Sequence, residues 1–124
     1  MPVPDFQSLM LPVLTAVAAE QTASPDLRRK VSESLNLGET DLAEMLPSGR
    51  QTTFSNRVAW ANVFLQRAGL IEKISRGTYR ATDLGRSLLN ESPAKIDMRL
   101  LARYPSFVDW RRRGAVGNKF RINR

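Results

Sequence analysis

The sequence predicts a mainly α-helical fold with one small β-hairpin, and three observations support this prediction. Apolar residues recur with helical spacing through most of residues 6–68. A long helical pattern begins after the turn residues Pro47-Ser48-Gly49 and stops at Gly69, a residue type that often follows a helix. Two short strand-like stretches, 70–74 and 78–81, then flank a turn that contains Gly77. The 124 residues are enough for one compact domain.

Three helices are expected before the long one. Asp5 caps the first helix, which Pro12 should kink or split into two short pieces. A loop at 21–23 leaves room for a short extended stretch. Ser24-Pro25-Asp26 then offers an N-cap, a proline at the first helical position and an acid in the first turn. The second helix should stop near Gly38, and 39–45 should form a short third helix.

The long helix has an apolar side and a polar side. Thr52 or Thr53 is its N-cap. At about 100° per residue, one stripe is apolar, with Trp60 and Phe64 beside it, and this side should face a core. The stripe consists of Phe54, Val58, Ala61, Leu65 and Ala68. Trp60 and Phe54 have residue types that could stack on a base, but we expect both in the core. We expect the Arg57 stem to pack and its guanidinium to meet an acid or a helix-terminal carbonyl.

Further helices follow the hairpin. Thr82-Asp83 caps a helix over 84–90, and two short helices, 97–103 and 106–113, are separated by Pro105. Their candidate anchors are Ile96, Leu100, Leu101, Tyr104, Phe107 and Trp110. We therefore expect three parts, which are a domain at 1–92, a helical extension packed on it at 93–113, and a flexible basic tail at 114–124.

This order of elements is that of a winged helix-turn-helix with additional C-terminal helices. In such a fold the long helix is the recognition helix and the hairpin is the wing. The recognition helix enters the major groove of DNA, and the wing contacts the backbone. The sequence therefore predicts a winged-helix DNA-binding domain at 1–92.

Composition excludes most enzyme classes. The chain has no cysteine and no histidine, which removes disulfides, thiolate nucleophiles, the usual zinc sites and the commonest general base. We expect no catalysis, no metal and no cofactor. The longest apolar run, Leu9–Ala19, is too short to span a bilayer, contains Pro12 and follows no basic residue. We expect a cytoplasmic protein without a membrane partner.

The net charge of +7 is unevenly distributed. Residues 1–49 hold three basic and seven acidic residues, whereas 50–86 hold seven and two and 87–124 hold nine and three. Positive charge on and after the long helix favours binding to phosphates, because their neutralisation releases counterions. Arg111, Arg112 and Arg113 are open to two interpretations, a solvated helix end or linker, and a DNA contact.

The candidate DNA-binding residues fall into three groups. The polar side of the long helix carries amides, a hydroxyl and a small residue, and such residues can read base edges in the major groove. The helix entrance offers backbone N–H groups and a cation for phosphate, and the hairpin adds further cations. A polar side exposed only to water is the alternative. The three groups are Ser55, Asn56, Ala59, Asn62 and Gln66; Arg50, Gln51 and Thr52; and Lys73, Arg76 and Arg80.

Several motifs together resemble the amino-terminal domain of Mrr-type restriction endonucleases, restriction system proteins that cleave modified DNA. The matching motifs span roughly residues 3–112. They are Pro4-Asp5-Phe6, Leu11-Pro12-Val13-Leu14, Leu46-Pro47-Ser48-Gly49-Arg50, Asn56-Arg57-Val58-Ala59-Trp60-Ala61, Ala68-Gly69-Leu70, Arg76-Gly77-Thr78-Tyr79-Arg80, Thr82 and Gly85.

The resemblance implies a winged-helix module that binds double-stranded DNA, including methylated DNA, and directs a nuclease domain in the same polypeptide. The family's nuclease half holds magnesium with acidic residues and a lysine on a mixed sheet, and no such sheet is expected in this chain. The nearest candidate for such a magnesium site is Glu72-Lys73, but no second acidic residue lies at a spacing that would complete it. The chain is therefore either a domain excised from a longer protein or a free-standing module.

Two alternative functions are compatible with the same fold. A small transcriptional regulator would act as a homodimer through the helices within 97–113. A protein interaction module would use the acidic first half to dock a basic partner, since folds of this kind also serve in assemblies.

Overall fold

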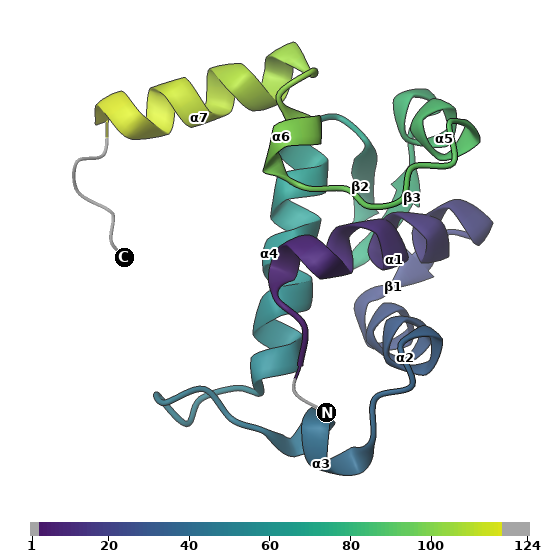
Figure 1. Ribbon diagram of the computed structural model, residues 1–124, viewed down its shortest axis with the longest axis vertical. Helices are drawn as coiled ribbons and strands as arrows, with labels where there is room; N and C mark the ends of the chain where they lie inside the picture. Colours follow the sequence, from purple (N-terminus) through teal and green to yellow (C-terminus); the bar gives the residue numbers. More distant parts are fainter. Residues whose placement is uncertain (1–2, 118–124) are drawn as a thin grey trace.

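The computed structural model describes residues 3–117, with only the backbone described for 115–117. It is built around the long helix α4 (Thr53–Arg67), which α1 (Phe6–Ala19) crosses with extensive contacts (Figure 1). The buried apolar residues of both helices form one core cluster. The mainly α-helical class with a small hairpin is confirmed.

The first helix is not split. α1 runs without interruption through Pro12, contrary to one of our expectations. A proline inside a helix removes one hydrogen bond and costs about 3 kcal/mol. Leu9, Met10, Val13 and Leu14 are all fully buried on the opposite side of α1, and their burial offsets this cost.

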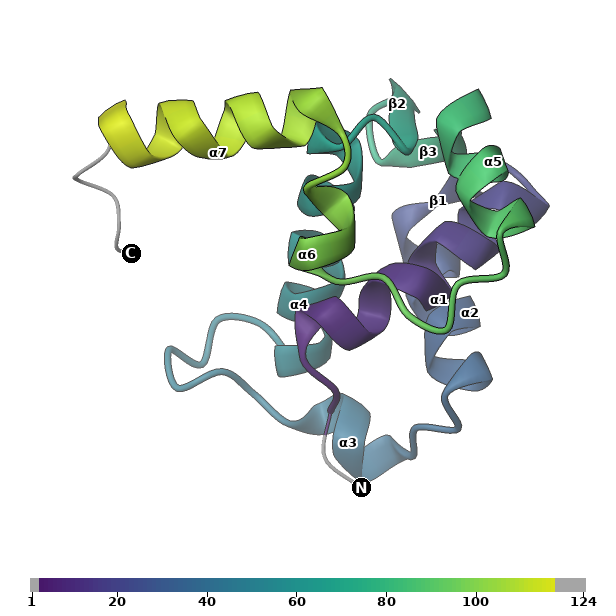
Figure 2. The ribbon, with the colours of Figure 1, turned by 45° about the horizontal axis from the view of Figure 1, so that its top comes forward.

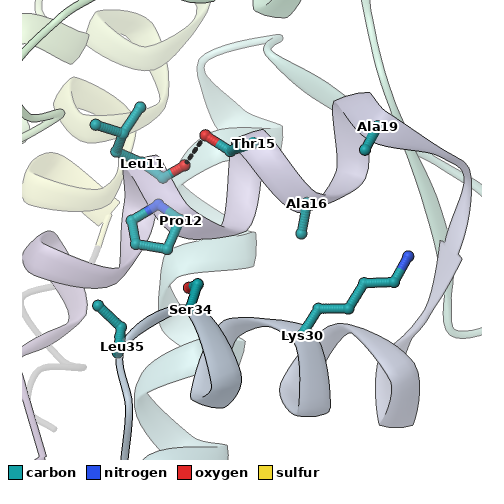
Figure 3. A pocket seen from close by; sticks show the side chains of 8 residues that line it. All are labelled: Leu11, Pro12, Thr15, Ala16, Ala19, Lys30, Ser34 and Leu35. Carbon is teal, nitrogen blue, oxygen red and sulfur yellow. Dashed lines mark hydrogen bonds between the residues drawn. The ribbon is translucent and has the colours of Figure 1, made fainter.

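The side of α1 that carries Pro12 faces α2 (Ser24–Ser34). An apolar groove of about 490 Å³ lies between the two helices (Figure 3). Within it, the Thr15 hydroxyl donates a hydrogen bond to the Leu11 carbonyl at 2.8 Å. The groove lies on the side of α1 away from the core, so it takes no part in the contact with α4.

Both ends of α2 differ from the expectation. The N-cap is Ala23, and Ser24 is the first helical residue, because its hydroxyl donates to the Gly77 carbonyl at 3.2 Å instead of accepting from its own helix. The helix ends well before Gly38. Asn36 adopts a positive φ of 55°, and the Leu37 N–H bonds the Ser32 carbonyl at 3.0 Å. Asparagine thus takes the left-handed capping position that glycine usually occupies.

Three short strands form one antiparallel sheet in the order β1-β3-β2. The extended stretch in the loop at 21–23 is β1 (Thr22–Ala23), and the hairpin consists of β2 (Ile71–Ser75) and β3 (Thr78–Ala81). Gly77 has a φ of 74° at the turn, as the hairpin prediction requires. Because β1 pairs with β3, the sheet joins the hairpin, which is the wing candidate, to the start of α2.

The third helix, α3 (Glu39–Ala43), is two residues shorter than expected. After it the chain turns back on itself, with a bridge between Met45 and Thr52 and a hydrogen bond from the Leu46 N–H to the Gln51 carbonyl. Figures 1 and 2 show this loop extending from the N-terminal end of α4. The recognition-helix candidate therefore has a protruding loop at its start and the wing beyond its end.

The C-terminal helices also shift relative to the prediction. α5 (Asp83–Asn90) begins at the expected Thr82 cap, but α6 (Met98–Leu101) is only four residues long. α7 (Pro105–Gly117) begins at Pro105, which occupies the first helical position instead of separating two helices. Of the predicted tail, residues 114–117 are helical, and the rest, 118–124, lies outside the described residues.

The described side chains attach α7 to the body through its first two turns. Ile96, Leu101, Tyr104 and Phe107 are buried as predicted, whereas Leu100 and Trp110 are half-buried. Figures 1 and 2 show the remainder of α7 extending away from the other helices. The division of the chain at residues 92 and 113 stays a prediction. Within residues 3–117, no helix is long and apolar enough to cross a membrane.

Candidate nucleic-acid interface

The apolar stripe of α4 is buried as predicted, but one of its neighbours is not. Phe64 is buried against Phe107 and Trp110, with ring centroids 5.8 and 5.4 Å away. Trp60 remains 49% exposed, so its placement in the core was wrong. α7 covers Phe64 and leaves Trp60, which touches Phe64 edge-on at 6.3 Å, at the border of the exposed surface.

The polar side of α4 is only partly at the surface. Ser55, Asn56 and Gln66 are half-buried and Ala59 is exposed, so these four remain available to a ligand. Asn62 is only 6% exposed, which contradicts its assignment to reading base edges directly in the groove. It borders the apolar stripe, and residues of α2 and β3 line a pocket beside it. No described group donates a hydrogen bond to its buried Oδ1.

A pocket of about 190 Å³ lies where α2, α4 and β3 meet. The structure brings four of the predicted residues together here and adds several that the sequence reasoning missed. The predicted ones are Ser55, Ala59, Asn62 and Gln66, and the others are Ser24, Arg28, Val58, Val63 and Tyr79. We refer to this feature as the Asn62 pocket.

The walls of the Asn62 pocket are held in place by the link between α2 and the wing. Both the N–H and the hydroxyl of Ser24 donate to the Gly77 carbonyl, at 2.8 and 3.2 Å. Tyr79 pairs with Thr22 across the sheet, and its neighbour Ala81 is buried. Strand alternation gave a signal for Tyr79, because it shares a face with Ala81. The sequence held no comparable signal for Arg28.

The helix entrance combines a structural residue with exposed ones. The Thr52 hydroxyl accepts a hydrogen bond from the Ser55 N–H at 3.1 Å and so caps α4. Arg50 and Gln51 are exposed in the preceding loop. Thr52 therefore orients the helix, while its two neighbours are free to approach a phosphate.

The hairpin cations point in different directions. Arg76 is exposed at the turn, and Lys73 is exposed opposite Tyr79. Arg80 pairs with Glu72 at 2.8 Å, and both alternate with residues that face α4. Arg80 therefore lies on the face of the hairpin opposite that of Lys73 and Tyr79, which does not support its assignment to a DNA-binding surface beside α4.

The remaining arginines of interest are engaged elsewhere or project into solvent. Arg57 donates to the carbonyls of Val3 and Pro4, so its expected carbonyl partner belongs to the segment before α1 and not to a helix end. Arg111 is exposed and donates to the Met98 sulfur at 3.8 Å. Arg112 and Arg113 are exposed as well, so both interpretations of these arginines stay open.

The described residues form no cluster of three or more acidic, histidine or cysteine side chains that could hold a metal ion. The shifted pKa values belong to groups away from the Asn62 pocket. Hydrogen bonds from the backbone of Gly38 and of Leu100 lower the pKa of Asp41 and Asp97, and Glu91 raises the pKa of Arg103.

A family model described as the Mrr N-terminal domain matches residues 6–91, more than half of the chain. The chain belongs to the Mrr N-terminal domain family. The resemblance found in the sequence is thus confirmed, and all the α4 and wing residues discussed above fall inside the matched Mrr N-terminal domain region.

One relative is the type IV methyl-directed restriction enzyme EcoKMrr of Escherichia coli K12. The two are 34% identical over 87 residues, which cover 68% of this chain and 28% of that enzyme. This Mrr N-terminal domain therefore spans little more than a quarter of the relative. No solved structure gives a significant match to the chain.

Proposed function

We propose that this Mrr N-terminal domain binds double-stranded DNA, with α4 in the major groove and the wing against the backbone. The arrangement supports this, since α4 presents Ser55, Asn56, Ala59 and Gln66 along its open side. Small and amide-bearing side chains suit close approach to base edges. Asn62 is excluded from this contact by its burial, and Arg80 by its position.

The observation with most weight is a set of unpaired cations around the open side of α4. Arg28, Arg50, Lys73 and Arg76 form no ion pair within residues 3–117. The nearby carboxylates are occupied elsewhere, because Asp26 pairs with Arg29 and Glu72 with Arg80. Unpaired cations that flank a helix can each neutralise a phosphate and release a counterion.

We further propose that the domain reads DNA for a restriction system. It would act without catalysis of its own, for a nuclease domain in the same longer polypeptide, and methylated DNA is one target class. Membership of the family and the name of its methyl-directed relative support this proposal. The matched segment covers 28% of that relative, as expected for one module of such an enzyme.

The experiment is fluorescence anisotropy of short duplexes, with and without adenine or cytosine methylation, at several salt concentrations. We expect affinity to fall linearly on a log-log salt plot. Arg28→Gln should lower the slope by about 1, as expected for the loss of one phosphate contact. Arg29→Gln is the matched control, because Arg29 is adjacent on α2 but faces Asp26 and Glu33. No binding even at low salt would contradict the proposal.

A further inference from the structure

The open side of α4 is bordered by different elements on its two sides. On one side, residues of α2 and β3 line the Asn62 pocket. On the other side, α7 packs on Phe64, with the Trp110 ring centroid 5.4 Å from that of Phe64. Asn62 and Phe64 lie about 160° apart around α4 at about 100° per residue. Trp60, about 40° from Phe64, is 49% exposed, so the open surface of α4 continues up to α7.

The contacts of α7 distinguish two flanks of this helix. The guanidinium of Arg67 lies over the Trp110 ring, 5.4 Å from its centroid, and Arg67 is exposed beside the open side of α4. Arg111 instead donates to the sulfur of Met98 in α6. Arg113 lies about 60° from Trp110 and about 160° from Arg111 around α7, about 4.5 Å beyond Trp110 along the axis. We call the side that carries Trp110 and Arg113 the Trp110 flank.

The arginines on this side of α4 are free to bind an anion. Arg67 and Arg113 are exposed and form no ion pair within residues 3–117. Stacking on Trp110 covers one face of the Arg67 guanidinium and leaves its edge, which carries the N–H donors, available. The sequence of α7 contains one carboxylate, Asp109, and it pairs with none of the described arginines.

A helix in the major groove meets two phosphate backbones, one on each side. The groove is about 12 Å wide and a helix with its side chains is about 10–12 Å across, so each strand passes close to one side of the helix. Arg28 and the hairpin cations Lys73 and Arg76 lie on the side of the Asn62 pocket, where they face one strand. The second strand runs on the side from which α7 projects (Figures 1 and 2).

We propose that the Trp110 flank of α7 binds the phosphate backbone of this second strand, through Arg67 and Arg113. The hairpin with α2 on one side and α7 on the other then hold the two strands that border one major groove. This inference rests on the proposed DNA-binding function and adds to its interface an element that lies outside the matched residues 6–91. It also separates the adjacent arginines of α7, because Arg113 contacts DNA and Arg111 does not.

The test is the salt dependence of duplex binding by the full chain, followed by fluorescence anisotropy. Arg113→Gln should lower the slope of the log-log salt plot by about 1, as expected for one lost phosphate contact. Arg111→Gln makes the same change of charge on the other flank of the same helix, and the slope should stay at the wild-type value. Both side chains are exposed, so both variants should keep the melting temperature of the wild type.

Asp109→Asn tests the same surface with the opposite sign. Asp109 is exposed and lies about 40° from Arg113 around α7. Its carboxylate repels a phosphate bound on the Trp110 flank. Removal of this charge should therefore strengthen duplex binding about twofold at 0.1 M salt, where charges about 10 Å apart still interact.

The outcomes separate this inference from the proposed function. An unchanged slope for Arg113→Gln, together with a loss of about 1 for Arg28→Gln, overturns the α7 contact and leaves DNA binding by the other elements in place. Equal losses for Arg113→Gln and Arg111→Gln also overturn it, because the effect then follows net charge and not the flank. Weaker binding by Asp109→Asn contradicts it as well. The absence of binding by the wild type at low salt overturns both proposals.

Discussion

Arg57, in the second turn of α4, donates a hydrogen bond to the carbonyl of Val3 at 2.7 Å, across 54 residues of sequence. The same guanidinium nitrogen donates to Pro4 at 3.2 Å. The chain before α1 is thereby tied to the helix that α1 crosses. Val3 is itself buried in the core cluster, so the contact fixes the first described residues against α4.

Removing these hydrogen bonds should destabilise the fold. Arg57→Met keeps the apolar stem and loses the donors, so we expect the free energy of unfolding to fall by about 1–3 kcal/mol. Urea denaturation measures the change as a lower midpoint at constant slope. Arg112→Met, in an exposed part of α7, should leave the midpoint unchanged. Equal midpoints for the two variants would show that the contact contributes nothing.

Two glycine-to-alanine substitutions should have opposite effects. A Cβ at Gly85 would lie 2.2 Å from the Leu70 carbonyl oxygen, so Gly85→Ala should destabilise the protein by about 1–3 kcal/mol. A Cβ at Gly114 meets no atom within 4 Å, and alanine favours a helix there by up to about 1 kcal/mol. Thermal unfolding should show a lower midpoint for the first variant. A raised midpoint for Gly85→Ala would mean that α5 moves away from Leu70 at little cost.

The two arginines of the wing should differ in their effect on DNA binding. Arg76 is exposed at the turn, whereas Arg80 pairs with Glu72 on the face of the hairpin away from α4. Arg76→Ala should lower the slope of the log-log salt plot by about 1, as expected for one lost phosphate contact. Arg80→Ala should leave the slope unchanged. Equal losses for both variants would place the DNA on a different face of the wing.

The cap of α6 should titrate at low pH. The Leu100 N–H donates to the Asp97 carboxylate at 3.0 Å, and this hydrogen bond together with nearby Lys95 lowers the pKa of Asp97 below its usual 3.8. A group with a depressed folded pKa stabilises the fold above its unfolded pKa, and this stability is lost as the pH falls through the folded value. NMR titration of the carboxyl carbon should give the lower pKa. In Asp97→Asn, which retains a capping side chain, this contribution to the pH dependence should disappear.

The order of elements followed from local signals that the structure confirms. The Thr52 cap and the Gly77 turn fix the bounds of α4 and the hairpin through contacts between residues close in sequence. Ser24 shows the limit of such signals. The sequence around it indicates a helix start correctly, but its hydroxyl is directed to Gly77, 53 residues away, and no local pattern reports that contact.

The candidate site was only partly predictable. At about 100° per residue, Asn62 lies about 80° from Phe54, nearer the apolar stripe than Ala59 at about 140°, so its burial was indicated by helix geometry. The pairing of Arg80 with Glu72 was not accessible, because a two-residue turn at 76–77 alone would place Arg80 opposite Lys73, and a bulge between Lys73 and Ser75 shifts the register by one residue. The pocket was not accessible either, because it forms only when α2 and β3 meet beside α4.

Because α7 projects from the body, its length sets the rotation of its far end about the helix axis. A 13-residue helix is about 20 Å long, and each residue advances it by about 1.5 Å and turns it by about 100°. Trp110 and Arg111 contact Phe64 and Met98, and beyond them the helix extends away from the other helices, so a residue inserted there is not absorbed by neighbouring elements. One added residue in α7 would shift the end of the helix only slightly but rotate it by more than a quarter turn relative to α4. The direction around the helix axis that the end of α7 faces, relative to α4, is therefore set by the number of residues in that helix.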